Sequence, residues 1–145
     1  NEWTILRNRD HFILTNKSYN SIEMKINNEG EIVSDGIYIR IKKTQGLTKN
    51  HNPMYETIDG EFIANKKLLL RTWKDGDSYK PLGMNGHKKV SDLLIDTKVD
   101  RFTKNTQLVL TADDEIIWVC GQSISDQVKV TKNTTNFVEL SFTQK

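Results

Sequence analysis

The stretch LLLRTWKDGDSYKPLGMNGHKKVSDLLIDTKV, residues 68–99, determines how the rest of the sequence is interpreted. The three leucines at its start are typical of a buried strand. The polar run at 74–77 then has the Asp and Gly residues of a sharp turn. A loop that contains one proline and two glycines comes next. We therefore expect a strand, a turn and a loop that lead into the last element of the stretch.

That last element has the spacing of a helix. Four residues recur at i, i+3, i+4 and i+7, as on one buried helical face: Val90, Leu93, Leu94 and Thr97. The opposite face carries charges of both signs: Lys88, Lys89, Asp92 and Asp96. Opposite charges about one turn apart favour local pairing. We expect a helix around residues 88–98.

Positive charge is concentrated in this part of the chain. Residues 66–89 hold seven Lys or Arg residues and two Asp residues, a local balance of +5 in a chain of net charge +2. A basic face is most often only solvated surface, but it also suits a polyanionic partner. Charge alone leaves both interpretations open.

Length and composition limit the class of protein. The 145 residues, 36% hydrophobic and 28% charged, are enough for one compact domain. No apolar run approaches the ~20 residues of a membrane span, and no signal-peptide pattern is present. The single cysteine, Cys120, excludes an intrachain disulfide and suits a reducing compartment. We expect a cytoplasmic protein without membrane contact, and we interpret a sequence that starts with Asn as a piece of a longer one.

Outside residues 68–99 the patterns favour short strands. Residues 21–26 and 37–41 alternate apolar and polar side chains, and residues 108–110 and 116–119 flank a turn, which predicts a hairpin. We also expect strands near five further segments, 3–6, 12–15, 62–65, 128–130 and 137–142, and a short helical turn in 100–106. The predicted fold class is α+β with mainly antiparallel pairing. We expect residues 1–65 to form a β-rich layer before the domain of residues 66–145, and we expect the two parts to pack as one unit.

Signals for catalysis or metal binding are weak. Asp75 and Asp77 resemble a carboxylate pair, yet in a turn they more often accept hydrogen bonds from nearby backbone N–H groups. The three histidines, His11, His51 and His87, have no ligand spacing. Cys120 lies in an apolar run and is expected to be a small buried packing residue. Trp118 is expected in the core, and core packing is also the preferred interpretation of Trp73 over stacking on a base.

Several blocks of the sequence, in the same order, resemble the C-terminal domain of tRNA(Ile)-lysidine synthetase. They are RTWKDGD (71–77), PLGM (81–84), GHKKVSD (86–92), IDTKV (95–99), IIWVCG (116–121), ISD (124–126) and KVT (129–131). The resemblance covers roughly residues 66–140. It implies β layers arranged as a sandwich with helices packed on them, a fold similar to a domain of the phenylalanyl-tRNA synthetase β subunit. The family often has an arginine where this sequence has the segment Gln122–Ser125.

The resemblance implies an accessory role in a modification enzyme. The family uses ATP to attach lysine to the wobble cytidine of an isoleucine tRNA, and its C-terminal domain holds the tRNA acceptor stem. The Ser-Gly-Gly-x-Asp-Ser loop of the family's ATP-binding domain is absent here, so we expect no catalytic residue, cofactor or metal in this chain. ATP and magnesium are expected in the catalytic domain of the parent ligase. That domain, the isoleucine tRNA and a second copy of the chain are the candidate partners.

A-form RNA is recognised through phosphates, 2′-hydroxyls and shape, which calls for lysines and arginines on a rigid surface. The matching blocks imply a tRNA-contact role for five basic residues: Arg71, Lys74, Lys80, Lys88 and Lys89. Charge adds three more: Lys98, Arg101 and Lys104. Three glycines are expected to shape the loop: Gly76, Gly83 and Gly86. The alternative function is a structural or protein-interaction module, between domains or in a dimer, whose basic face is incidental.

Overall fold

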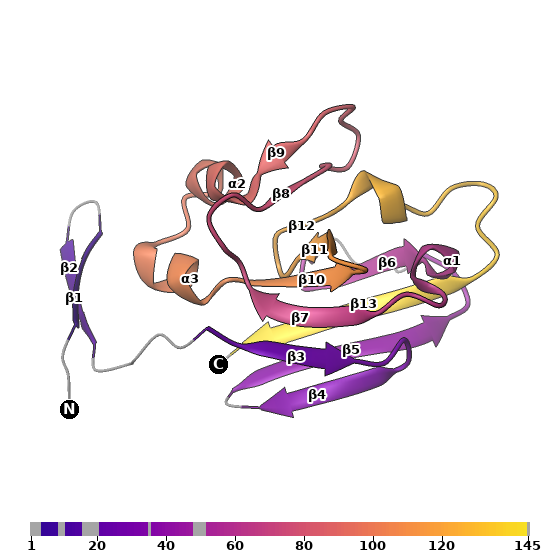
Figure 1. Ribbon diagram of the computed structural model, residues 1–145, viewed down its shortest axis with the longest axis horizontal. Helices are drawn as coiled ribbons and strands as arrows, with labels where there is room; N and C mark the ends of the chain where they lie inside the picture. Colours follow the sequence, from indigo (N-terminus) through magenta and orange to yellow (C-terminus); the bar gives the residue numbers. More distant parts are fainter. Residues whose placement is uncertain (1–3, 9–10, 16–20, 35, 48–51, 145) are drawn as a thin grey trace.

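Two antiparallel β-sheets lie face to face, and a layer of short helices covers the outer side of one of them (Figure 1). This computed structural model describes residues 4–8, 11–15, 21–34, 36–47 and 52–144. Trp3 and His51 lie outside the described residues, as do residues 9–10 between the strands expected at 3–6 and 12–15. The predicted α+β class with mainly antiparallel strands is confirmed.

The five-stranded sheet has the order β12-β11-β10-β7-β3. Its strands, in sequence order, are β3 (Glu23–Ile26), β7 (Leu68–Thr72), β10 (Leu108–Ala112), β11 (Glu115–Val119) and β12 (Ser123–Ile124). The predicted hairpin is β10–β11, in which Leu110 lies opposite Trp118. Asp113 and Asp114 form its turn with positive φ values of 46° and 69°.

The four-stranded sheet has the order β4-β5-β13-β6. Its strands are β4 (Gly30–Ser34), β5 (Ile37–Thr44), β6 (Tyr55–Asp59) and β13 (Phe137–Gln144). The last strand thus lies between two strands from the first half of the chain. Since β3 also pairs with β7, strands from before and after residue 65 share both sheets.

Two short antiparallel pairs complete the strands. One is β1 (Thr4–Asn8) with β2 (His11–Thr15), two strands close to the segments 3–6 and 12–15 expected from the sequence. The other is β8 (Ser78–Tyr79) with β9 (Lys88–Lys89). It lies over the five-stranded sheet beside α2 (Val90–Asp96) and α3 (Arg101–Thr106) (Figure 1). We call these elements, β8, β9, α2 and α3, the cap layer.

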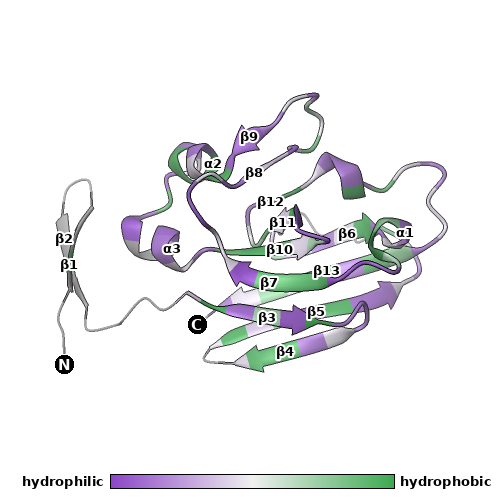
Figure 2. Cartoon of the chain, viewed as in Figure 1, coloured by the Kyte–Doolittle hydropathy of each residue, from purple (hydrophilic) through white to green (hydrophobic). Residues whose placement is uncertain are grey.

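Apolar side chains fill two separate spaces. The larger core lies between the sheets, whose strands carry most of the hydrophobic segments (Figure 2), and it includes Ile39, Leu70, Trp118 and Leu140. The smaller core lies between the five-stranded sheet and the cap layer. It consists of seven buried residues: Tyr79, Val90, Leu93, Leu94, Val109, Ile116 and Val119. The five-stranded sheet is therefore covered on both faces.

Several local predictions are confirmed and two are wrong. The expected apolar helix face is buried at Val90, Leu93 and Leu94, although the helix begins at Val90 and not at residue 88. The strand expected at 62–65 is wrong, because Asp59 caps a helical turn, α1 (Gly60–Ile63), by accepting a hydrogen bond from the Glu61 N–H at 3.0 Å. The strand expected at 128–130 is also wrong. A 3₁₀ turn, η1 (Asp126–Val128), stands there, capped by the Ser125 hydroxyl.

Candidate nucleic-acid interface

Arg71 and Asp77 form a partly buried ion pair where β7 ends. The Arg71 guanidinium donates to both carboxylate oxygens of Asp77, at 2.9 and 3.0 Å, and the two side chains are 13% and 15% exposed. Burial alone would raise the pKa of Asp77, but hydrogen bonds from Arg71 and the Lys74 backbone and the charges of both residues hold it below its ordinary value. A bidentate pair of this kind is fixed in orientation. It orders the turn that follows β7.

The turn at 74–77 links β7 to the cap layer. Asp77 accepts a hydrogen bond from the Lys74 N–H at 2.7 Å, so the local backbone contact expected for Asp77 is confirmed. Gly76 adopts a φ of 91°, in the left-handed region that favours glycine. The carbonyl of Asp77 then accepts from the Val90 N–H at 2.9 Å. The side chain of Lys74 is left exposed beside the start of α2.

Lys88 and Lys89 precede α2 and differ in their contacts. Lys88 pairs with Asp96 at the far end of the helix, which confirms the local charge pairing expected from the sequence. The hydrogen bond to Asp96 raises the pKa of Lys88, although part of this effect is offset by desolvation. Lys89 is exposed and makes no ion pair with any other described residue. Of these two lysines, Lys89 is the one whose ammonium group no described carboxylate engages.

Asp126 anchors the loop between β8 and β9. The sequence did not indicate it as a candidate residue. Its Oδ1 accepts from the Gly83 N–H at 3.0 Å and lies 3.1 Å from the Lys129 ammonium, and its Oδ2 lies 3.8 Å from the Lys80 ammonium. Its own N–H donates to the Lys80 carbonyl at 2.8 Å. The hydrogen bond from Gly83, followed by that from Lys129, holds the pKa of Asp126 below its ordinary value.

The remaining predicted cations lie on or beside α3. Lys98 and Arg101 are exposed, at the end of α2 and the start of α3. The Lys104 carbonyl accepts a hydrogen bond from the Trp73 indole N–H at 2.6 Å, and its ammonium lies 5.7 Å from the centre of the Trp73 ring. Trp73 is half-buried against the smaller core, which agrees with the packing role preferred from the sequence.

The eight predicted cations therefore fall into two groups. Arg71, Lys80 and Lys88 are engaged by carboxylates. The other five make no ion pair within the described part of the chain: Lys74, Lys89, Lys98, Arg101 and Lys104. We call these five residues the basic end. The hydrogen bond from the Val90 N–H to the Asp77 carbonyl connects the turn that carries Lys74 to the cap layer, and the Trp73–Lys104 bond connects α3 to the end of β7.

A cleft of about 260 Å³ lies beside the Arg71–Asp77 pair. It brings together Arg71, Gly76 and Lys80 of the predicted set with His87, and the acidic residues Asp114 and Glu115 close its other side. Such mixed charge does not favour one sign of ligand. Within the described residues, no group of three His, Cys, Asp or Glu side chains is arranged to hold a metal ion.

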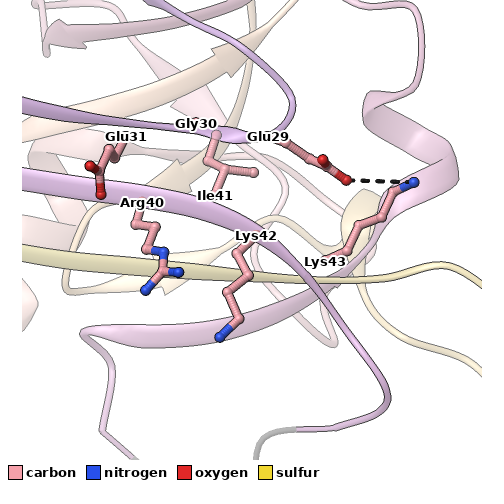
Figure 3. A pocket seen from close by; sticks show the side chains of 7 residues that line it. All are labelled: Glu29, Gly30, Glu31, Arg40, Ile41, Lys42 and Lys43. Carbon is pink, nitrogen blue, oxygen red and sulfur yellow. Dashed lines mark ion pairs between the residues drawn. The ribbon is translucent and has the colours of Figure 1, made fainter.

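A larger hollow, about 490 Å³, is lined by Glu29 and by residues of β4 and β5, and its lining includes no residue of the cap layer (Figure 3). It carries both signs of charge, because Glu29 and Glu31 line one side, and Arg40 and Lys42 extend from the neighbouring strand. Glu29 also lies 3.5 Å from the Lys43 ammonium, and Glu31 accepts from the Tyr38 hydroxyl at 3.2 Å. This balance distinguishes the hollow from the basic end.

Two other predictions concern buried groups. Cys120 is buried, as expected, and burial raises the pKa of its thiol, which disfavours a reactive thiolate. Trp118 is completely buried in the larger core, also as expected. Of the helices in the described segments, none has the length and apolar character needed to cross a membrane.

Comparison with known proteins identifies the family. The family model described as the TilS substrate C-terminal domain matches residues 68–140, which is half of the chain. The chain belongs to this family. A crystal structure of a TilS C-terminal domain has the same fold, with a TM-score of 0.74 over 86% of this chain and 98% of that one, at 17% sequence identity. The resemblance noted in the sequence is thereby confirmed.

The relatives that match this TilS family member are longer proteins named tRNA(Ile)-lysidine synthase. A tRNA(Ile)-lysidine synthase of Clostridium tetani is 32% identical over 112 residues, which are 75% of this chain and 24% of the relative. One of Clostridium acetobutylicum is 30% identical over 133 residues, 90% of this chain and 28% of the relative. The chain therefore spans about a quarter of the length of these relatives, and the match reaches into its first 65 residues.

Proposed function

We propose that this chain is the C-terminal, non-catalytic region of a tRNA(Ile)-lysidine synthase and that it holds the acceptor stem of an isoleucine tRNA. The observation that carries the proposal is the basic end. Its five cations make no ion pair with other described residues, and they lie on the cap layer of a TilS-type fold or in the turn that leads into it. Cations already engaged by carboxylates contribute less to an RNA contact.

The placement of these cations suits the chemistry of an acceptor stem. Side chains cannot read the deep major groove of A-form RNA, so contacts fall to phosphates and 2′-hydroxyls. Lys89 precedes α2, which packs on the smaller core, and Lys98 and Arg101 lie where α2 leads into α3. The hydrogen bond from the Trp73 indole to the Lys104 carbonyl fixes α3 in turn, so the spacing of these cations is restricted. Each phosphate contact would add affinity without sequence preference.

The parent enzyme's chemistry belongs outside this chain in the proposal. Lysidine formation needs ATP, lysine and magnesium, and we assign their binding to the catalytic domain of the longer polypeptide. The cytoplasm, where tRNA is modified, is the proposed location. Here the chain's task is to raise the residence time of the tRNA on the enzyme.

The test is binding of the chain to isoleucine tRNA and to an acceptor-stem minihelix between ~50 and ~200 mM salt. The variant Lys89→Ala/Arg101→Ala removes two cations of the basic end. The control Arg40→Ala/Lys42→Ala removes the same two residue types from the hollow on β4 and β5. We expect the first variant to lower the slope of log affinity against log salt by about 2, and the control to leave the slope unchanged.

Two results would contradict the proposal. An equal loss of RNA affinity in both variants would show that binding depends on net charge alone and not on the position of the basic end. No RNA binding by the wild-type chain at ~50 mM salt would favour the alternative, a module that contacts the catalytic domain or a second copy. Light scattering of the same samples would then distinguish the monomer from the dimer.

A further inference from the structure

The loop between β8 and β9 presents two apolar side chains to solvent. Leu82 and Met84 are 53% and 49% exposed, in a chain whose other large apolar residues mostly fill the two cores. We call residues 78–89 the finger. Its loop, between β8 and β9, projects beyond the rest of the cap layer at the top of Figure 1. Exposed apolar residues on a projecting element are typical of contact surfaces.

The finger is held in one shape by its base. Pro81 bridges to Ser125, Asp126 accepts from the Gly83 N–H, and the Met84 N–H donates to the Pro81 carbonyl at 3.1 Å. Gly83 has a φ of 79°, so residues 81–84 form a tight turn of type II with Leu82 and Met84 at its surface. The two apolar side chains are therefore presented by an ordered turn, which lowers the entropy cost of binding.

The finger itself carries three lysines and no carboxylate. Lys80 and Lys129 flank Asp126 at the base, and Lys88 and Lys89 form the returning strand. Asp96 and Asp126 are each engaged by lysines. Asp114 and Glu115 line the neighbouring cleft, whose lining includes neither Leu82 nor Met84. Charge complementarity therefore favours a polyanion as the occupant of this surface, and its apolar centre needs a partner with exposed ribose or base surface.

We propose that the finger lies in the shallow minor groove of the RNA duplex that the cap layer binds, with Leu82 and Met84 against riboses and base edges. The wide minor groove of A-form RNA admits such an element, whereas the minor groove of B-form DNA is narrow. Asp126 is the positioning residue, because it fixes Gly83 and holds Lys80 and Lys129. This inference rests on the proposed RNA binding.

The first test compares apolar truncations. Leu82→Ala/Met84→Ala is measured against Ile95→Ala/Val33→Ala, which removes exposed apolar side chains from α2 and β4. We expect the finger variant to bind the acceptor-stem minihelix about tenfold more weakly with an unchanged salt slope, because no charge is lost. The control should bind as the wild type does. On a DNA hairpin of the same sequence, all three proteins should bind equally.

The second test separates positioning from charge. Asp126→Ala and Asp96→Ala each remove one negative charge and one lysine partner, so charge alone predicts tighter RNA binding for both. Asp126→Ala also releases the Gly83 N–H, and we expect weaker binding for it alone. Asp126→Asn keeps an oxygen that can accept from Gly83, and it should restore most of the affinity. Unchanged thermal unfolding of the apolar variants would show that their fold is intact.

The outcomes separate this inference from the proposed function. If Lys89→Ala/Arg101→Ala weakens RNA binding but Leu82→Ala/Met84→Ala does not, the cap layer binds RNA and the placement of the finger is wrong. If the finger variant turns a dimer into a monomer with unchanged RNA affinity, the finger contacts a second copy and the inference also fails. If the wild-type chain binds no RNA, both proposals fall.

Discussion

The two sheets differ in how many of their faces are covered, and the difference explains where charge is placed. In the five-stranded sheet every residue of β10 is buried, because the larger core lies on one face and the cap layer on the other. In the four-stranded sheet, buried and more exposed residues alternate along β13. A sheet with one solvated face carries polar residues on that face. In a sheet that is covered on both faces the strands are mostly apolar, so the polar surface belongs to the layer that covers it.

The largest expected effect tests whether the cap layer is as firmly packed as the sandwich. Leu94 in α2 and Leu140 in β13 are both fully buried, one in each core. We expect Leu94→Ala and Leu140→Ala each to lower the free energy of unfolding by about 2–5 kcal/mol. Urea unfolding followed by tryptophan fluorescence and by circular dichroism would measure it.

A much smaller loss of unfolding free energy for Leu94→Ala, or a separate early transition for the cap layer, would show that the cap layer is less firmly packed than the sandwich. The smaller core would then be a loosely attached layer that unfolds on its own. A matched control is Ile95→Ala, on the same helix but exposed, which should change the free energy of unfolding by no more than about 0.5 kcal/mol.

The next effect concerns the carboxylate beside the five-stranded sheet. The folded-state pKa of Asp77 lies below its ordinary value, so its contribution to stability is present above about pH 4 and is lost as pH falls through the folded-state pKa. We expect Asp77→Asn to cost up to about 3 kcal/mol at pH 7, because Arg71 loses its partner. The difference from wild type should shrink as the pH falls from 5 toward about 2. A difference in unfolding free energy between Asp77→Asn and wild type that does not depend on pH would contradict the role given to the ion pair.

The smallest effect has the opposite sign and lies on the four-stranded sheet. Burial raises the pKa of Glu56 on β6, and no ion pair to Glu56 forms within the described residues. The charged form is therefore a cost above its ordinary pKa, and this cost disappears below about pH 4. We expect Glu56→Gln to be more stable than wild type at pH 7, by less than about 1 kcal/mol, and equal to it at pH 3.5. Thermal unfolding at the two pH values would check this, and lower stability at pH 7 would refute it.

Elements that depend on local contacts were predictable from the sequence. The α2 face and the β10–β11 hairpin follow from spacing and turn residues, and both are found. The pairing of Lys88 with Asp96 was anticipated for the same reason. In contrast, the apolar residues at 62–65 favoured a strand, but the capping carboxylate of Asp59 decided for a helical turn.

The candidate site was less predictable, because its order comes from distant residues. A count of lysines and arginines cannot separate Lys89, which pairs with no described carboxylate, from Arg71, which is partly buried against Asp77. The finger was expected only as a loop, since its shape depends on Asp126, more than 40 residues further along. The signal that could have indicated Asp126 was its position in the ISD block, ahead of Lys129.

The position of β13 has a consequence for how the chain folds during synthesis. Its two neighbours, β5 and β6, leave the ribosome long before residues 137–144 are made. Until then their facing edges have no partner, and unpaired strand edges invite association with other chains. The four-stranded sheet is completed last, when a late strand inserts between two earlier ones. A nascent chain halted just before Phe137 should therefore be the form that chaperones bind most strongly.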